Sequence, residues 1–207
     1  GFYKYSPFTL FLFTPFTLIS YETASIVDFF IIASFAIATI ILLEQIISKY
    51  LFAGRKINLL VLLSILLCVL NHLVRELHLG NTNMILLFLL SLSLKFTLES
   101  KPIRSGVFLA VAVITKPYFI ICLLPFLIYK KQNTILSFAA TLILFLTSSG
   151  LIIGVSKSMV LYSEWFSAMK DHSDYLTSHH TVFSLLNNFW GLSIPASYGI
   201  FLLGAMA

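Results

Sequence analysis

The chain has 207 residues, of which 59% are apolar and only 10% are charged, with 13 Lys and Arg against 8 Asp and Glu. An ordinary soluble domain is about 25% charged, so this chain has too few charged side chains to cover a soluble fold. Composition excludes a soluble enzyme, a disordered tail, a disulfide-stapled secreted domain and a nucleic-acid-binding domain. The class that remains is a helical membrane protein that crosses the bilayer several times.

Long continuous apolar runs, without the alternation of barrel strands, favour helices as the spanning elements. The first run, residues 5–20, contains Pro7 and Pro15, which break a continuous helix, so we expect a short interfacial or re-entrant helix there. The sequence then predicts full spans over residues 24–47, 57–70, 84–97 and 132–155, with polar segments between them.

The run 105–129 carries Lys116 and Pro117 at its midpoint, and a lysine at the bilayer centre costs about 2.5–3.5 kcal/mol on insertion scales. Two arrangements remain, a single kinked helix with a buried lysine and a hairpin of two short helices with Lys116 at the apex. The hairpin is favoured because it places three basic loops on one side of the membrane, as the positive-inside rule requires. Those loops hold Lys49, Arg55, Lys56, Lys101, Arg104, Lys130 and Lys131.

Most of the remaining polar chemistry is expected on the opposite, outward side. That side is predicted to hold the first residues, the polar segment 71–83, the Lys116 apex and a polar, aromatic segment over 156–190, before a further helix from residue 192. A functional site is therefore expected there. The five histidines, all in these outward segments, are His72, His78, His172, His179 and His180. Their spacing matches no recognised metal motif, so no metal site is predicted.

Lys116 is the first candidate functional residue. An ammonium between two apolar helices is costly unless it meets water or an anion, and it suits a phosphate as a point charge. The alternative is a lysine whose stem snorkels to the membrane boundary.

The segment that ends just before the span at 84–97 holds the next candidates. Asn81 follows Gly80 and is predicted as a helix N-cap. Alternatively, Asn81 and Asn83 hydrogen-bond a sugar or phosphate at the rim of a cavity. Arg75 and Glu76, just upstream, can form a surface ion pair of little energetic effect.

Four short motifs occur in a definite order along the chain. They are Tyr5-Ser6-Pro7 at the start of an apolar helix, Gly80-Asn81-Thr82-Asn83, Gly106 in a short helix ending at Thr115-Lys116-Pro117, and a polar loop with His179, His180 and Ser184. In this order they resemble the polyprenyl-phosphate-sugar-dependent membrane glycosyltransferases of the GT-C superfamily. The closest likeness is to glycosyltransferase family 87, the branch that includes bacterial alpha-mannosyltransferases. That branch typically has Tyr-Pro-Pro, Gly-Gln-x-Asn and Lys-Pro motifs. Here Ser6 replaces the first proline and Asn81 the glutamine.

The resemblance implies an all-α, polytopic transmembrane helix bundle with short or re-entrant helices and an outward-facing cavity. It implies transfer of a hexose, mannose in the first instance, from a polyprenyl-phosphate donor to a lipid or glycan acceptor. The location is the extracytoplasmic face of the plasma (inner) membrane, and neither a metal ion nor a cofactor is expected. By family analogy Lys116 holds the donor phosphate, with Arg75 beside it. The residues implied for the sugar and acceptor cavity are Tyr5, Asn81, Asn83, His179 and His180.

The catalytic base has no candidate in this reading. An inverting transfer needs a carboxylate to accept the proton of the acceptor hydroxyl, and in the family this aspartate precedes the tyrosine-proline start. We therefore expect the base upstream of Gly1. Residues 1–207 would then be one transmembrane domain of a longer protein, without its first helix and loop and its C-terminal helices. Asp28 and Glu44 are poor substitutes, because both lie in or beside a span.

The sequence is also compatible with two other functions. One is a membrane transporter or lipid flippase without transferase chemistry, since broken helices and intramembrane lysines also occur there. The other is a structural subunit of an envelope complex, which would have no cavity. The transferase hypothesis depends on Lys116 sharing one aqueous pocket with His179 and His180.

Overall fold

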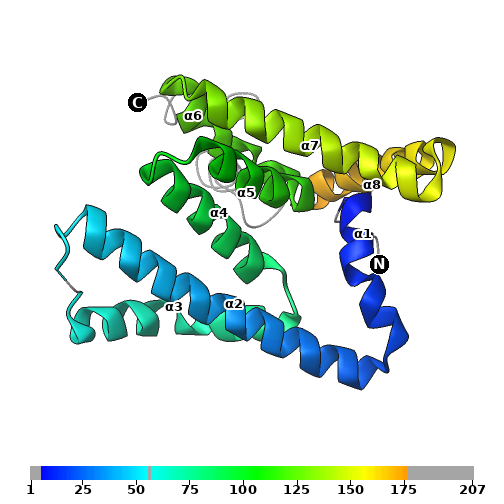
Figure 1. Cartoon of the computed structure of the whole chain (residues 1–207). Helices are drawn as coiled ribbons and strands as arrows, with labels where there is room; N and C mark the ends of the chain where they lie inside the picture. The colour runs from blue at the N-terminus through cyan, green and yellow to red at the C-terminus, as the bar shows by residue number, and fades with distance from the viewer. Residues whose placement is uncertain (1–5, 56, 177–207) are drawn as a thin grey trace, which may run out of the picture. The chain divides into compact units, whose positions relative to one another are not determined.

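The computed structural model describes residues 6–55 and 57–176, with side chains described as far as residue 168. Within those ranges the fold is all-α, as predicted, and no strand occurs (Figure 1). The chain divides into two compact units, residues 5–155 and the terminal residues 1–4 with 156–207. The helices are α1 Pro7–Phe13, η1 Thr14–Leu18, α2 Tyr21–Tyr50, α3 Leu59–Leu79, α4 Asn83–Leu98, α5 Pro102–Thr115, η2 Pro117–Leu123, α6 Leu124–Ile128, α7 Gln132–Ile153 and α8 Val155–Leu176.

Three of the described helices, α2, α3 and α7, are long and apolar enough to cross a membrane. The spans predicted at 24–47 and 132–155 correspond to α2 and α7. The predicted span 57–70 is too short, because α3 continues to Leu79 and includes most of the segment expected to be a polar loop. The run predicted at 84–97 is the 16-residue helix α4. At 1.5 Å per residue α4 is about 24 Å long, less than the roughly 30 Å hydrocarbon core.

The predicted break in the first apolar run is confirmed. Pro7 occupies the first turn of α1, and a 3-10 helix with Pro15 in its first turn follows directly. Proline is favoured at the start of a helix, where its missing N–H leaves no bond unmade. Ser20 then caps α2 by accepting a hydrogen bond from the Thr23 amide.

The turn from α3 to α4 differs from the expected capping. Gly80 adopts a left-handed conformation with φ 61° and ends α3. The backbone N–H of Asn81 donates a hydrogen bond to the backbone carbonyl oxygen of Glu76. This is the pattern in which a left-handed glycine lets the last carbonyls of a helix be satisfied. The N-cap prediction for Asn81 is therefore wrong, because this residue closes α3 and Thr82 is the one that precedes α4.

The hairpin predicted at Lys116 is present. Lys116 has extended backbone (φ −136°, ψ 103°), since a following proline disfavours the helical conformation. The chain then returns along α5 as η2 and α6. Side chains of this return arm, including Phe119, Cys122 and Phe126, pack on the core formed by Leu109, Ala110, Val113 and Phe138. α5 and the return arm each extend about 21 Å at ordinary helical rises.

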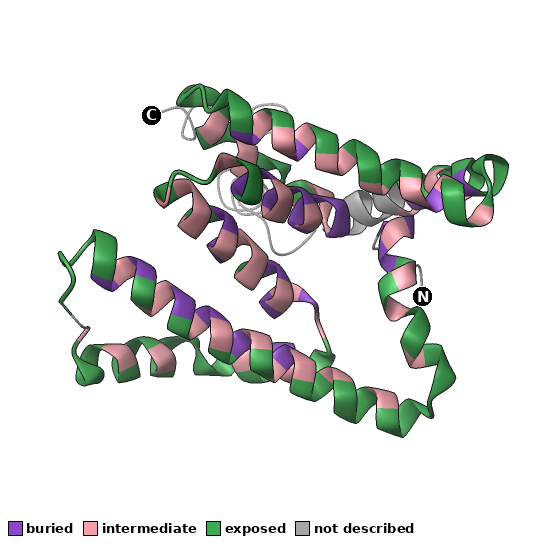
Figure 2. Ribbon diagram, viewed as in Figure 1, coloured by how far each residue is buried: buried purple, intermediate pink, exposed green. Residues whose placement is uncertain are grey.

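Gly106 lets α5 approach α7 closely. A Cβ atom at this position would lie 2.5 Å from the Thr134 carbonyl oxygen and 2.7 Å from the Phe138 amide nitrogen. A hydrogen bond of 2.8 Å from the Ser137 hydroxyl to the Ile103 carbonyl joins the same two helices. Figure 2 shows how much of α5 is buried, which makes this helix the centre of the unit.

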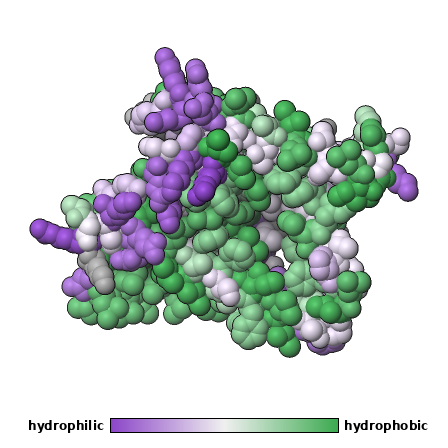
Figure 3. All heavy atoms as spheres, in the orientation of Figure 1, coloured by the Kyte–Doolittle hydropathy of each residue, from purple (hydrophilic) through white to green (hydrophobic). Residues whose placement is uncertain are grey.

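Several of the described basic residues gather at one end of this unit, away from Arg75 and Lys116. Lys130 and Lys131 share a hollow with the turn between α4 and α5. Lys49, at the end of α2, shares a second hollow with Lys95 and Glu99 of α4. Hydrophilic side chains are concentrated on this side in Figure 3. The hairpin prediction requires the basic loops to lie at the same end of the helices. We call this end the basic end.

The segment expected as a polar loop from residue 156 begins instead as a helix. Gly154, with φ 89°, ends α7, and α8 runs from Val155 to Leu176. Its polar residues suggested a loop, but the stretch has no proline or glycine to interrupt a helix. The rest of that segment and the helix expected from residue 192 lie outside the described residues.

Candidate active site

A chain of polar contacts joins three helix ends opposite the basic end. The Lys116 ammonium donates a hydrogen bond to the Asn83 side-chain oxygen. The Asn83 side-chain nitrogen donates in turn to a carboxylate oxygen of Glu76 at 2.7 Å. These contacts fix the orientation of the amide, because its oxygen faces the cation and its nitrogen faces the anion. We call Glu76, Asn83 and Lys116 the polar triad.

The fold brings these residues together through two short connections. The Gly80 turn joins the last turn of α3, which carries Glu76, to the first residue of α4, Asn83. α4 and α5 then run side by side, so that Lys116 at the end of α5 returns to the start of α4.

The register between α4 and α5 is held near the basic end. The Ser93 hydroxyl donates to the Ser105 carbonyl oxygen at 2.9 Å, and the Thr97 and Ser105 hydroxyls lie 2.7 Å apart. Because α5 is short and continuous from there to Thr115, this register also sets the position of Lys116.

The contacts of the triad matter for stability because Glu76 is buried. Glu76 is only 4% exposed, and a buried carboxylate is costly unless it is hydrogen-bonded. The Asn83 amide supplies such a bond, and His72 lies on the exposed side with its Nε2 atom 3.9 Å from the carboxylate. Lys116 is half-buried and bound to the protein, so it is not a lysine that merely snorkels into solvent.

Helix length indicates the depth of the triad. If the basic end lies at one boundary of the hydrocarbon core, α4 and α5 reach about 24 and 21 Å across a core of roughly 30 Å. Lys116 and Asn83 then lie about 6–9 Å short of the opposite boundary. A charge at that depth requires an aqueous or anionic partner.

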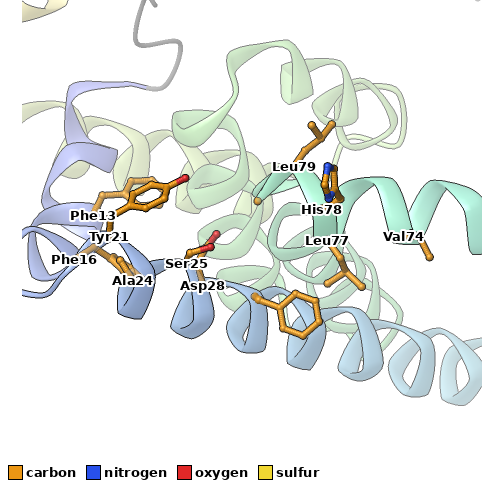
Figure 4. A pocket seen from close by; sticks show the side chains of 12 residues that line it. Phe13, Phe16, Tyr21, Ala24, Ser25, Asp28, Val74, Leu77, His78 and Leu79 are labelled. Atoms are coloured by element: carbon orange, nitrogen blue, oxygen red, sulfur yellow. The ribbon is translucent and has the colours of Figure 1, made fainter.

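A hollow of about 810 Å³ opens beside the triad, between η1, the start of α2 and the end of α3. Its wall includes Phe13, Phe29, Leu77 and other apolar side chains. Figure 4 shows the Asp28 carboxylate extending from α2 toward the end of α3, where His78 lies.

The structure joins two of the predicted site residues directly, Lys116 and Asn83. Asn81 lies half-buried in the adjacent turn, and Arg75 is exposed on α3. Tyr5, His179 and His180 lie outside the described residues, and so does the predicted pocket that Lys116 shares with the two histidines. Their roles remain predictions.

Two acidic residues have a larger part in the site than the sequence predicts. Glu76 does not form the expected surface ion pair with Arg75; it is buried and binds Asn83, seven residues along the chain. The glycine between them was the available signal, because a left-handed turn there folds Glu76 back onto Asn83. Asp28 lies in the span α2, as predicted, and also lines the hollow.

The chain matches glycosyltransferase family 87 over residues 2–207. No curated protein and no solved structure matches it. The family match covers nearly the whole sequence and agrees with the helical fold and its three candidate membrane spans. The chain therefore belongs to glycosyltransferase family 87 and is a membrane glycosyltransferase.

Proposed function

We propose that the protein transfers a hexose, with mannose as the first candidate, from a polyprenyl-phosphate donor to a lipid or glycan acceptor. The transfer takes place on the extracytoplasmic face of the plasma (inner) membrane. The observation that carries this proposal is the polar triad, which holds a lysine ammonium at an end of the short helix α5.

The triad suits the phosphate of a lipid-linked donor. An ammonium is a compact point charge that binds phosphate oxygens well. The ammonium carries three N–H donors, and its contact with Asn83 holds it at the end of α5. A site recessed about 6–9 Å from the boundary also fits a donor whose isoprenoid chain stays in the bilayer.

The proposed face follows from the distribution of charge. Cytoplasmic loops carry an excess of lysine and arginine, and the basic end holds Lys49, Lys95, Lys130 and Lys131. If that end is cytoplasmic, the triad lies on the opposite, extracytoplasmic side.

Each predicted site residue has a role in this proposal. Lys116 binds the donor phosphate, with the exposed Arg75 as a second cation on α3. Asn83 holds Lys116 in place and, with Asn81, lines the sugar cavity. Tyr5, His179 and His180 complete the sugar and acceptor cavity. The general base is not assigned to any of these residues.

The direct test measures donor binding by the full-length protein in lipid nanodiscs, with polyprenyl-phosphate mannose as the probe. Lys116→Ala is expected to weaken binding by roughly tenfold or more, since a hydrogen bond to a charged group contributes about 1.5–3 kcal/mol. Lys116→Arg keeps the charge and should bind more tightly than Lys116→Ala.

The matched control is Lys131→Ala, which removes a lysine from the basic end of the same hairpin and should leave donor affinity unchanged. Equal affinity in Lys116→Ala and the wild type would contradict the assigned role. Donor lipid that crosses the bilayer without release of its sugar would support the transporter or flippase alternative.

A further inference from the structure

The hollow beside the triad has a chemical character of its own. It is lined mainly by aromatic and aliphatic side chains of η1, α2 and α3, and its volume of about 810 Å³ lies within the usual range for small-molecule sites. The polar groups on its wall are Tyr21, Ser25, Asp28 and His78. An apolar hollow with a few polar groups is typical of a site for an amphiphile.

Asp28 is the central polar group of this hollow. Its side chain is half-buried, and within the described residues it forms neither a hydrogen bond nor an ion pair. A carboxylate on an apolar helix is costly unless it meets water or a polar ligand. Tyr21, Ser25 and His78 also lie on the wall of the hollow, but none of them donates a hydrogen bond to Asp28, so a ligand with a hydroxyl group can supply the donor that this carboxylate requires.

The carboxylate lies directly against the turn that leads to the triad. A Cβ atom on Gly80 would come within 3.1 Å of an Asp28 carboxylate oxygen, so glycine permits this approach. One helical turn along α2, Ile32 packs against Met84, the neighbour of Asn83. The hollow and the triad thus lie on either side of the same short turn.

We propose that this hollow binds the acceptor, a lipid-linked molecule whose hydroxyl group donates a hydrogen bond to Asp28. This proposal rests on the proposed function and names the acceptor site within it. The aromatic and aliphatic wall holds the apolar part of the acceptor, and the carboxylate binds its hydroxylated head. A negative group repels phosphate, so the donor phosphate binds at Lys116 and the uncharged hydroxyl at Asp28.

The test uses two photoreactive probes with the same diazirine-bearing octyl chain, one with a β-glucose head and one with a permethylated glucose head. The full-length protein in lipid nanodiscs is labelled with each probe, and labelled peptides are mapped by mass spectrometry. The glucoside is expected to label the peptides around Phe13–Phe29 and Val74–Gly80. The permethylated probe, which has no hydroxyl donors, should label them about tenfold less.

Variants separate a hydrogen bond from a charge effect. Asp28→Ala should reduce glucoside labelling about tenfold. Asp28→Asn should reduce glucoside labelling less, because the amide oxygen still accepts a hydrogen bond from a hydroxyl group. The matched control is Glu44→Gln, which neutralises a carboxylate near the other end of α2 and should leave labelling unchanged.

Three outcomes overturn the proposal. Equal labelling by both probes would show an apolar hollow without hydroxyl recognition, and equal labelling of Asp28→Ala would show that the carboxylate takes no part. Absence of these peptides from the labelled set would show that the protein's own chain fills the hollow.

Donor binding is measured separately in the same preparations. If donor binding is lost in Lys116→Ala but kept in Asp28→Ala, the protein has two separate sites. If the wild type does not bind the donor, the proposed function is refuted, whatever the labelling result.

Discussion

Gly106→Ala tests the packing that positions the candidate site. The added Cβ would lie 2.5 Å from the Thr134 carbonyl oxygen, 2.7 Å from the Phe138 nitrogen and 2.8 Å from the Ser137 Cβ. Carbon contacts are comfortable at about 3.5–4.0 Å, so α5 and α7 must separate by roughly 1 Å. Two of the three atoms are backbone and cannot rotate away. Because two contacts are with backbone, the upper part of the overpacking range applies, about 2–3 kcal/mol. Alanine recovers about 1 kcal/mol through helix propensity, so a net loss of about 1–2 kcal/mol is expected.

The assay is thermal unfolding of the purified protein in detergent, where about 2–4 °C of Tm corresponds to each kcal/mol for a chain of this size. Gly150→Ala is the matched control, because it lies in α7 and its Cβ would meet only Val155, at 3.8 Å. Gly106→Ala should lower Tm by about 2–8 °C, and Gly150→Ala should leave it unchanged or raise it. If the two variants have the same Tm, the close approach of α5 and α7 described above is incorrect.

Two further predictions concern pairs of polar side chains. Asn83→Leu leaves the buried Glu76 carboxylate without its amide and should destabilise the fold by about 3 kcal/mol; the double variant Glu76→Met with Asn83→Leu should recover much of that loss in a thermal unfolding cycle, and an additive result would contradict the coupling. At the basic end, the hydrogen bond from Lys101 lowers the pKa of Glu99, so its stabilising effect is present above the ordinary value of 4.5 and is lost as pH falls through the lowered pKa. Lys101→Ala should therefore reduce Tm slightly at pH 7, and the difference should shrink as pH falls below 4.5; a difference that stays constant as the pH is lowered would exclude this pair as its source.

Composition and proline placement predicted most of the fold. The apolar runs located α2, α4 and α7, and Pro7 and Pro15 predicted the short first helices. The energetic cost of a central lysine, combined with the charge rule, predicted the hairpin at Lys116. In each case physical requirements that can be read from the sequence were strong enough to decide the local structure without tertiary information.

The candidate site was less accessible because it depends on partners that are distant in sequence. Asn83 and Lys116 were each predicted as site residues, but their contact spans 33 positions and follows from the register of α4 and α5. Glu76 resembles a surface residue beside Arg75 in the sequence, since the rotation of about 100° between adjacent helix residues decides which of the two is buried. The end of α3 was placed too early because polar residues suggested a loop, whereas the left-handed Gly80 is what terminates the helix.

The polar triad also explains how a charged lysine can lie at the apex of a short hairpin in such an apolar chain. An isolated lysine at the apex of a short hairpin would favour a hairpin long enough to reach water. The chain instead keeps α5 at 14 residues and neutralises the ammonium through Asn83 and the buried Glu76. The negative charge of Glu76 weakens the binding of a phosphate at Lys116. The triad therefore fixes the position of the ammonium but lowers its affinity for the donor phosphate. Glu76→Gln removes this negative charge, so donor affinity, measured in the same nanodisc assay, should rise if Lys116 is the phosphate ligand. An unchanged or lower affinity in Glu76→Gln would contradict this account.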